Sequence, residues 1–188
     1  MKIYKEKIKI IKGFTLIETM VAVFILSLSV VGIVGMISSS YFSAVYSKNE
    51  ITATYLMQEA VDYVRNDRDT SVILGGQDWN SFISKYNSCS TVDGCYLNIL
   101  DNSIYSCSSD PDESFGEIVC PRFTLDEGSI PYYNYNSLPG NSNFKRKIVI
   151  EGNSSNPNQI DMYVTVEWKN GNLVRSRSLE YSILNWTN

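Results

Sequence analysis

A single carboxylate stands in a stretch of chain that is otherwise apolar. The 24 residues from Phe14 to Ile37 are apolar or small, and Glu18 is the one charged side chain among them. At about 1.5 Å of rise per residue, a helix of this length covers a bilayer core of roughly 30 Å. An ionised carboxylate in such a helix costs up to about 3 kcal/mol, so Glu18 requires a partner.

Four cysteines form the second group that could do chemistry: Cys89, Cys95, Cys107 and Cys120. The gaps between them are five, eleven and twelve residues, whereas a zinc site needs paired short spacings such as C-x2-C. We therefore expect two disulfides rather than a metal site. The spacing leaves all three possible connectivities open.

The chain contains no histidine. This absence removes Ser-His and Cys-His nucleophilic mechanisms and every histidine-bound metal, so only carboxylates, tyrosines or lysines are left for catalysis. We therefore expect no enzymatic role and no cofactor.

Charge is distributed unevenly along the chain. Residues 1–13 hold five lysines and one glutamate, while the rest holds 11 Lys and Arg against 19 Asp and Glu, a net charge of −8. By the positive-inside rule, the lysine-rich end stays in the cytoplasm and everything beyond Ile37 is exported. We expect a single-pass protein of the cytoplasmic (inner) membrane whose cysteines lie on the oxidising side.

The apolar segment is expected to continue as one helix to about Arg68, because residues 38–69 contain neither proline nor glycine. Apolar residues recur there at spacings of three and four and form a stripe, and charged residues lie elsewhere on the helix. The stripe consists of Ala53, Met57, Ala60, Val61 and Val64. Arg65 and Arg68 suit the helix C-terminus through the macrodipole, so we interpret them as structural.

Residues 70–143 are rich in Gly, Pro, Asn, Asp and Ser and predict turns and loops rather than long elements. Three strand-like runs follow, at 147–152, 159–168 and 173–184. The predicted fold class is α+β, in which a long N-terminal helix packs on a small C-terminal antiparallel sheet with a disulfide-containing loop region between them.

The last two runs predict a hairpin with Asn170-Gly171 as its turn. That turn pairs Trp168 with Leu173, Met162 with Leu179 and Ile160 with Tyr181. The register keeps the apolar residues on one face. It also places Arg175 and Arg177 on this face near the turn, where their stems lie over the edge of the core and their heads reach water.

A basic leader, Gly13, Phe14, the string Thr15-Leu16-Ile17-Glu18 and an unbroken apolar helix follow one another at the start of the chain. This order resembles the type IV pilin superfamily with its class III prepilin leader, which includes type IV pilus subunits and the pseudopilins of type II secretion. The "QEAVDYVRNDRD" and "LNW" segments are similar to those of minor pilins and minor pseudopilins.

The resemblance implies processing and assembly. In that family a membrane-embedded aspartyl prepilin peptidase cuts after the glycine, here between Gly13 and Phe14, and methylates the new N-terminal residue, Phe14. Glu18 then becomes the fifth residue and faces the amine of a neighbouring subunit in the fibre. The implied partners are other pilin or pseudopilin subunits, the prepilin peptidase and the inner-membrane assembly platform, with membrane lipid around the helix before assembly.

A calcium loop is a weaker candidate. Asp110, Asp112 and Ser114 have the spacing of calcium ligands, but Gly116 comes one place late and Pro121 stands where the closing glutamate belongs. Calcium in another loop geometry stays open.

Two surface clusters also have alternative interpretations. The "FKRK" run from Phe144 to Lys147, with Arg175 and Arg177, is either a basic patch for DNA or a solvated strand end, and the acidic exported part favours the strand end. The remaining cluster, which either binds a sugar or a surface or belongs to a loop folded back on the core, consists of Tyr132, Tyr133 and Tyr135.

Two functions from different classes follow. The first is a structural subunit, a minor pilin or pseudopilin of a type IV pilus, a competence pilus or a type II secretion pseudopilus. The second is a fibre-tip adhesin or binding module that pilin-type assembly delivers. No nucleic-acid partner is expected. The expected divisions are a leader at 1–13, a transmembrane and filament-core helix at 14–37, its exported continuation at 38–69 and a globular domain at 70–188.

Overall fold

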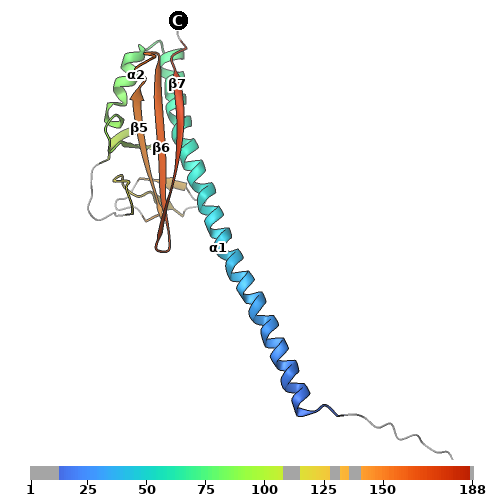
Figure 1. Cartoon of the computed structure of the whole chain (residues 1–188). Coiled ribbons are helices and arrows are strands. Elements are labelled where there is room, and N and C mark those ends of the chain that lie inside the picture. The colour runs from blue at the N-terminus through green and yellow to red at the C-terminus, as the bar shows by residue number, and fades with distance from the viewer. Residues whose placement is uncertain (1–12, 108–114, 128–131, 136–140, 187–188) are drawn as a thin grey trace, which may run out of the picture. The chain divides into compact units, whose positions relative to one another are not determined.

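The computed structural model of the protein describes residues 13–107, 115–127, 132–135 and 141–186 (Figure 1). The chain divides into two compact units, residues 1–45 and residues 46–188. The first helix, α1, runs from Leu16 to Arg68 over 53 residues and contributes to both units. Its end at Arg68 confirms the predicted helix end. Residues 38–68 contain neither proline nor glycine, the two residues that would interrupt a helix earlier.

The second unit is an α+β fold, as predicted. Its main sheet has five antiparallel strands in the order β2-β1-β5-β6-β7, and β3 and β4 form a separate two-stranded sheet. A π-helical turn at Asp69–Leu74 follows α1. The remaining elements are α2 Trp79–Lys85, a 3-10 turn at Asn87–Cys89, β1 Cys95–Asn98, β2 Ser103–Ser106, β3 Thr124–Asp126, β4 Tyr132–Asn134, β5 Phe144–Gly152, β6 Gln159–Asn170 and β7 Leu173–Leu184.

The core lies between the stripe of α1 and one face of β6. The alternating residues of β6 are buried from Ile160 to Trp168, and all five predicted stripe residues of α1 are buried as well. These residues belong to one cluster. Each large side chain buried there stabilises the fold by about 1.5–3 kcal/mol, which makes this contact the main source of stability in the unit.

The predicted hairpin exists, but its predicted register was wrong by two residues. The turn is Gly171-Asn172, so Trp168 lies opposite Arg175, and Ile160 lies opposite Ile183. Gly171 has a φ of 61° and takes the first central position of the turn, where a left-handed conformation suits glycine. The shift keeps every side chain on its predicted face and buries Ile183, which explains why this register is preferred.

Arg175 and Arg177 reach residues of α1 from the turn end of β7. The Arg177 guanidinium forms an ion pair with Glu50. The Arg175 guanidinium lies over the Tyr46 ring at 6.0 Å from its centroid. Both arginine side chains remain exposed.

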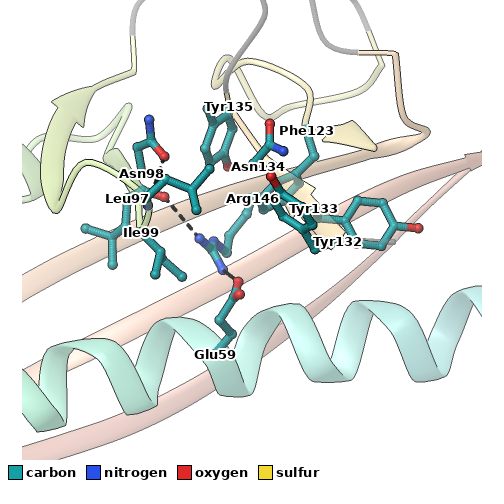
Figure 2. Close-up of a pocket in the computed structure, with 11 residues that line it drawn as sticks. Glu59, Leu97, Asn98, Ile99, Phe123, Tyr132, Tyr133, Asn134, Tyr135 and Arg146 are labelled. Carbon is teal, nitrogen blue, oxygen red and sulfur yellow. Dashed lines mark hydrogen bonds and ion pairs between the residues drawn. The ribbon is translucent and has the colours of Figure 1, made fainter. Parts of the chain in front are cut away.

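The interpretation of "FKRK" as a solvated strand end was wrong, because Phe144, Lys145 and Arg146 are all buried. Arg146 points toward α1 (Figure 2), where its Nη1 donates to the Glu59 carboxylate and to the Leu56 carbonyl, each at 2.8 Å. Its Nη2 donates to the Leu97 carbonyl at 3.3 Å. A buried guanidinium is tolerated here because three acceptors, two from α1 and one from β1, surround it.

Lys145 and Glu167 lie opposite each other in the β5–β6 register, on the other face of the sheet. Both are buried. Lys145 Nζ donates to the Ile118 carbonyl at 3.1 Å, and the Glu167 carboxylate accepts the backbone N–H groups of Gly116 and Glu117 at 2.7 and 3.1 Å. A Cβ at Gly116 would lie 2.9 Å from a Glu167 carboxylate oxygen, so a larger residue there would require this carboxylate to shift.

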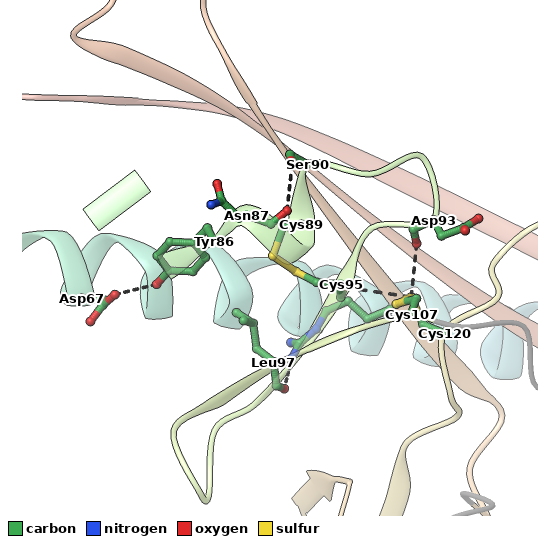
Figure 3. Close-up of a disulfide and its surroundings, with 11 residues drawn as sticks. Asp67, Tyr86, Asn87, Cys89, Ser90, Asp93, Cys95, Leu97, Cys107 and Cys120 are labelled. Atoms are coloured by element: carbon green, nitrogen blue, oxygen red, sulfur yellow. Dashed lines mark hydrogen bonds between the residues drawn. A yellow bond between two sulfur atoms is a disulfide. The ribbon is translucent and has the colours of Figure 1, made fainter. Parts of the chain in front are cut away.

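Two disulfides connect the loop region, which confirms the prediction and selects one of the three open connectivities (Figure 3). Cys89 pairs with Cys95, six residues away, and Cys107 pairs with Cys120, thirteen residues away. All four are buried. The Cys107 N–H also donates to the Gly94 carbonyl at 3.0 Å, which ties the second bridge to the start of β1.

Replacing Glu59 by Ala should lower the free energy of unfolding by about 1–3 kcal/mol, because Arg146 keeps a buried charge without a carboxylate. The value is below that of a fully buried pair because the Glu59 side chain is 41% exposed and therefore screened. Denaturant titration of the full chain in detergent micelles measures it. Gln58→Ala, on the neighbouring exposed position, is the control and should change the value by less than about 0.5 kcal/mol. Equal effects of the two variants would contradict this role of Glu59.

Removing the disulfides should destabilise the unit according to loop length. Replacing Cys107 and Cys120 together by Ala should cost about 3 kcal/mol, and replacing Cys89 and Cys95 about 2 kcal/mol, since the longer bridge restricts the unfolded chain more. The same denaturant titration measures both. In the unreduced wild-type chain, an alkylating reagent should label none of the four cysteines, and stoichiometric labelling of all four would contradict the bridges.

Candidate processing and assembly site

Thr15 caps the N-terminal end of the first helix. Residues 13–15 are not helical, and α1 starts at Leu16. The N–H of Glu18 donates to the Thr15 carbonyl at 3.1 Å and lies 3.4 Å from the Thr15 hydroxyl, and the N–H of Thr19 donates to the same carbonyl at 3.2 Å. This is the Thr side of a capping box. Sequence reasoning missed Thr15, although the spacing Thr-x-x-Glu carries the signal.

The Gly13–Phe14 bond lies in the non-helical segment just before this cap. The Phe14 side chain is 78% exposed. A Cβ built on Gly13 would meet nothing within 4 Å, so packing within the described chain does not require glycine there. The bond is therefore not covered by packing within the described chain.

Apolar side chains cover α1 on every side between Leu16 and Ile37. All residues of this segment are exposed, and the serine hydroxyls within it donate to carbonyls one turn back, Ser27 to Val23 and Ser29 to Ile25. A helix that is apolar all round requires an apolar environment. By length and composition, α1 is able to cross a membrane.

Glu18 lies in the first turn of this apolar helix. A carboxylate at that position interacts favourably with the positive end of the helix macrodipole. Among the described residues no cation lies within ion-pair distance of it. Gly13, Phe14 and Glu18 lie within six consecutive residues at the start of α1.

A family model described as the prokaryotic N-terminal methylation motif matches residues 8–34. The matched segment contains Gly13, Phe14 and Glu18, and the long apolar helix continues beyond it. The chain is type IV pilin-like. Comparison with curated proteins and with solved structures gave no match.

The leader motif of this pilin-like chain implies interaction with a prepilin peptidase and with other pilin subunits. Together with the apolar helix, it indicates membrane anchoring. Pilin-type proteins are structural rather than enzymatic.

The structure supports neither a metal site nor a single basic patch among the described residues. The calcium candidates Asp110, Asp112 and Ser114 lie outside the described residues. Within the part of the chain that the structure describes, no three His, Cys, Asp or Glu residues gather as metal ligands would. The basic cluster does not form one patch, because Lys145 and Arg146 are buried while Arg175 and Arg177 contact α1.

The tyrosine cluster is divided between core and surface. Tyr135 is buried and stacks on Phe123 at 4.5 Å between ring centroids. Tyr133 is half-buried, and Tyr132 is 42% exposed. The folded-back loop therefore accounts for Tyr135 and part of Tyr133, and Tyr132 remains available at the surface.

Cells with an active prepilin peptidase should contain a chain that begins at Phe14 with one added N-methyl group. The reason is the exposed Gly13–Phe14 bond at the boundary between basic leader and apolar helix. Intact mass spectrometry of the membrane-extracted protein measures this. Gly13→Leu should block the cleavage, whereas Gly32→Ala, a glycine change inside the helix, should leave it intact. A chain that still begins at Met1 would contradict the predicted cleavage between Gly13 and Phe14.

Proposed function

We propose that this chain is a structural subunit, a minor pilin or pseudopilin, of a type IV pilus, competence pilus or type II secretion pseudopilus. Prepilin peptidase cleaves it between Gly13 and Phe14 and methylates the Phe14 amine. The chain then rests in the membrane until an inner-membrane assembly platform transfers its helix into the fibre. Its role is mechanical, and it has no catalytic step.

One observation carries this proposal: among the described residues, Glu18 has no cation within ion-pair distance, and the helix around it is apolar as far as Ile37. Cleavage creates a positive amine on Phe14, four residues earlier. When such helices stack side by side, the amine of one subunit lies beside the Glu18 carboxylate of the next. In an apolar fibre core, removing one partner of such a pair costs about 3–5 kcal/mol, so the pair sets the axial register of the subunits.

The charge distribution supports an orientation. Five lysines in residues 1–13 keep this end in the cytoplasm, and the second unit is exported. Two disulfides in that unit are stable on the oxidising side of the membrane. The subunit therefore moves from the cytoplasmic membrane into a fibre on the outer side.

The presence of Glu18 also supports a position within the fibre. A subunit at the extreme tip has no neighbour above it whose amine would pair with this carboxylate. A chain that keeps Glu18 therefore belongs beneath at least one other subunit, either just below the tip or within the shaft.

Glu18→Ala should reduce incorporation into sheared fibres at least tenfold, because the loss of the pair removes about 3–5 kcal/mol of assembly energy. Export, leader cleavage and the fold of the second unit should stay intact, since Glu18 belongs to the first unit and is not a member of the second unit's core cluster. Immunoblots of the membrane pool and the sheared fibre fraction measure the ratio.

The matched control is Glu18→Asp, which keeps the charge and should retain more incorporation than Glu18→Ala. Loss of the protein from the membrane pool would instead indicate a folding or export defect. Equal incorporation of Glu18→Ala and wild type would show that the carboxylate has no assembly partner, and it would point to a tip position or a simple anchor.

A further inference from the structure

A small pocket opens beside the buried arginine of the second unit (Figure 2). It lies between the turn at residues 98–100 and β4, and its volume is about 100 Å³. Its walls are mostly apolar and include Leu97, Phe123 and Tyr133. This volume is several times what one water molecule needs, so the pocket is large enough for a small chemical group.

Two buried hydrogen-bond donors line this pocket. Neither the Tyr135 hydroxyl nor the Arg146 Nε–H makes a hydrogen bond of normal geometry among the described residues, although the Arg146 side chain lies close enough to Tyr135 to offset part of the rise that burial causes in the pKa of its hydroxyl. Tyr135 is 7% exposed and Arg146 is fully buried. Buried donors are normally hydrogen-bonded, so both groups are able to serve an oxygen acceptor that enters this pocket.

The charge around the donors favours a neutral acceptor. The Arg146 guanidinium is already paired with the Glu59 carboxylate at 2.8 Å. Burial raises the pKa of Tyr135, which keeps its hydroxyl protonated and able to donate. An anionic ligand would approach Glu59 as well as Arg146 and would be repelled. A carbonyl oxygen, which is neutral, meets both donors without this repulsion.

Exposed aromatic rings surround the mouth of the pocket. Tyr132 and Tyr133 line both this pocket and a neighbouring open hollow of about 400 Å³, which also contacts Tyr55 and Glu59. Tyr132 is 42% exposed and Tyr55 is 67% exposed. Rigid amphipathic rings beside a few placed polar groups are typical of a ligand site, and the apolar faces of sugar rings stack on such rings.

We propose that this pocket binds the acetamido group of an N-acetylhexosamine. The carbonyl oxygen accepts from the Tyr135 hydroxyl and the Arg146 Nε–H, and the methyl group contacts Phe123 and Leu97. The pyranose ring lies outside on Tyr132, where Glu59 accepts from a sugar hydroxyl. This assignment does not rest on fibre assembly, and it holds for the chain in the membrane as well as in a fibre.

Saturation-transfer difference NMR of the full chain, in micelles of a detergent without a sugar headgroup, tests the proposal. The probes are N-acetylglucosamine and N-acetylgalactosamine, with glucose and galactose as matched sugars that lack the acetamido group. At least one acetylated sugar should receive its strongest saturation at the acetamido methyl. The unacetylated sugars should bind at least about tenfold more weakly, because they leave both donors unpaired.

Tyr135→Phe removes only the hydroxyl and keeps the stacked ring. It should weaken binding of the acetylated sugar about fivefold, the effect of one hydrogen bond. The melting temperature should change little, because this hydroxyl makes no hydrogen bond of normal geometry within the described chain. Tyr132→Ala should also weaken binding. Tyr163→Phe and Tyr163→Ala, at an exposed tyrosine on the opposite face of β6, should leave binding unchanged.

Two results would overturn the assignment. The first is an absence of methyl saturation with both acetylated sugars, which would mean that the pocket holds only water. The second is equal binding by wild type and Tyr135→Phe, which would place the sugar elsewhere. Neither result bears on the role of Glu18 in assembly, because Glu18 does not line this pocket.

Discussion

The apolar side chains of α1 between Leu16 and Ile37 have no packing partner within the described chain, and the rest of the molecule depends on this constraint. Leaving these side chains in water costs about 25 cal/mol of free energy for each square ångström of exposed apolar surface. Lipid or other apolar helices must therefore cover them. The lipid core accepts the helix but offers no cation to Glu18, whereas the proposed assembly would supply the N-terminal amine of a neighbouring subunit. Under that proposal, the residues that suit the helix to a membrane also favour its transfer into an assembly of like helices.

Buried charged side chains that require partners also hold the second unit together. Its loop region has few long apolar runs, and inward-pointing charged side chains from the central strands connect it to the sheet. Arg146 reaches α1 and β1 on one face, while Lys145 and Glu167 hold the segment around Gly116 on the other. Each of these groups is buried and hydrogen-bonded, so the loss of one partner is expensive. Two disulfides complete the connections.

Helix α1 contributes side chains both to the core of this unit and to the surface beside the pocket. The stripe from Ala53 to Val64 packs into the core, while Tyr55 and Glu59 lie beside the pocket near Tyr132. The two proposals, a structural subunit and a binding module, are therefore compatible in one chain, because the proposed assembly contact at Glu18 and the proposed pocket at Tyr135 use different residues. Pilin-type assembly would then deliver the pocket to the outside.

The sequence by itself determined the long helix, its end at Arg68, the buried faces of α1 and β6, and the N-terminal motif. Those features follow from local periodicity and from residue types that lie close together in the chain. The tertiary structure alone decided the disulfide pairing, the hairpin register and the burial of Arg146. Burying Ile183 outweighed the Asn-Gly turn signal, and acceptors from Glu59, Leu56 and Leu97 made a buried guanidinium stable. Each outcome depends on contacts between residues far apart in the chain, which no local pattern records.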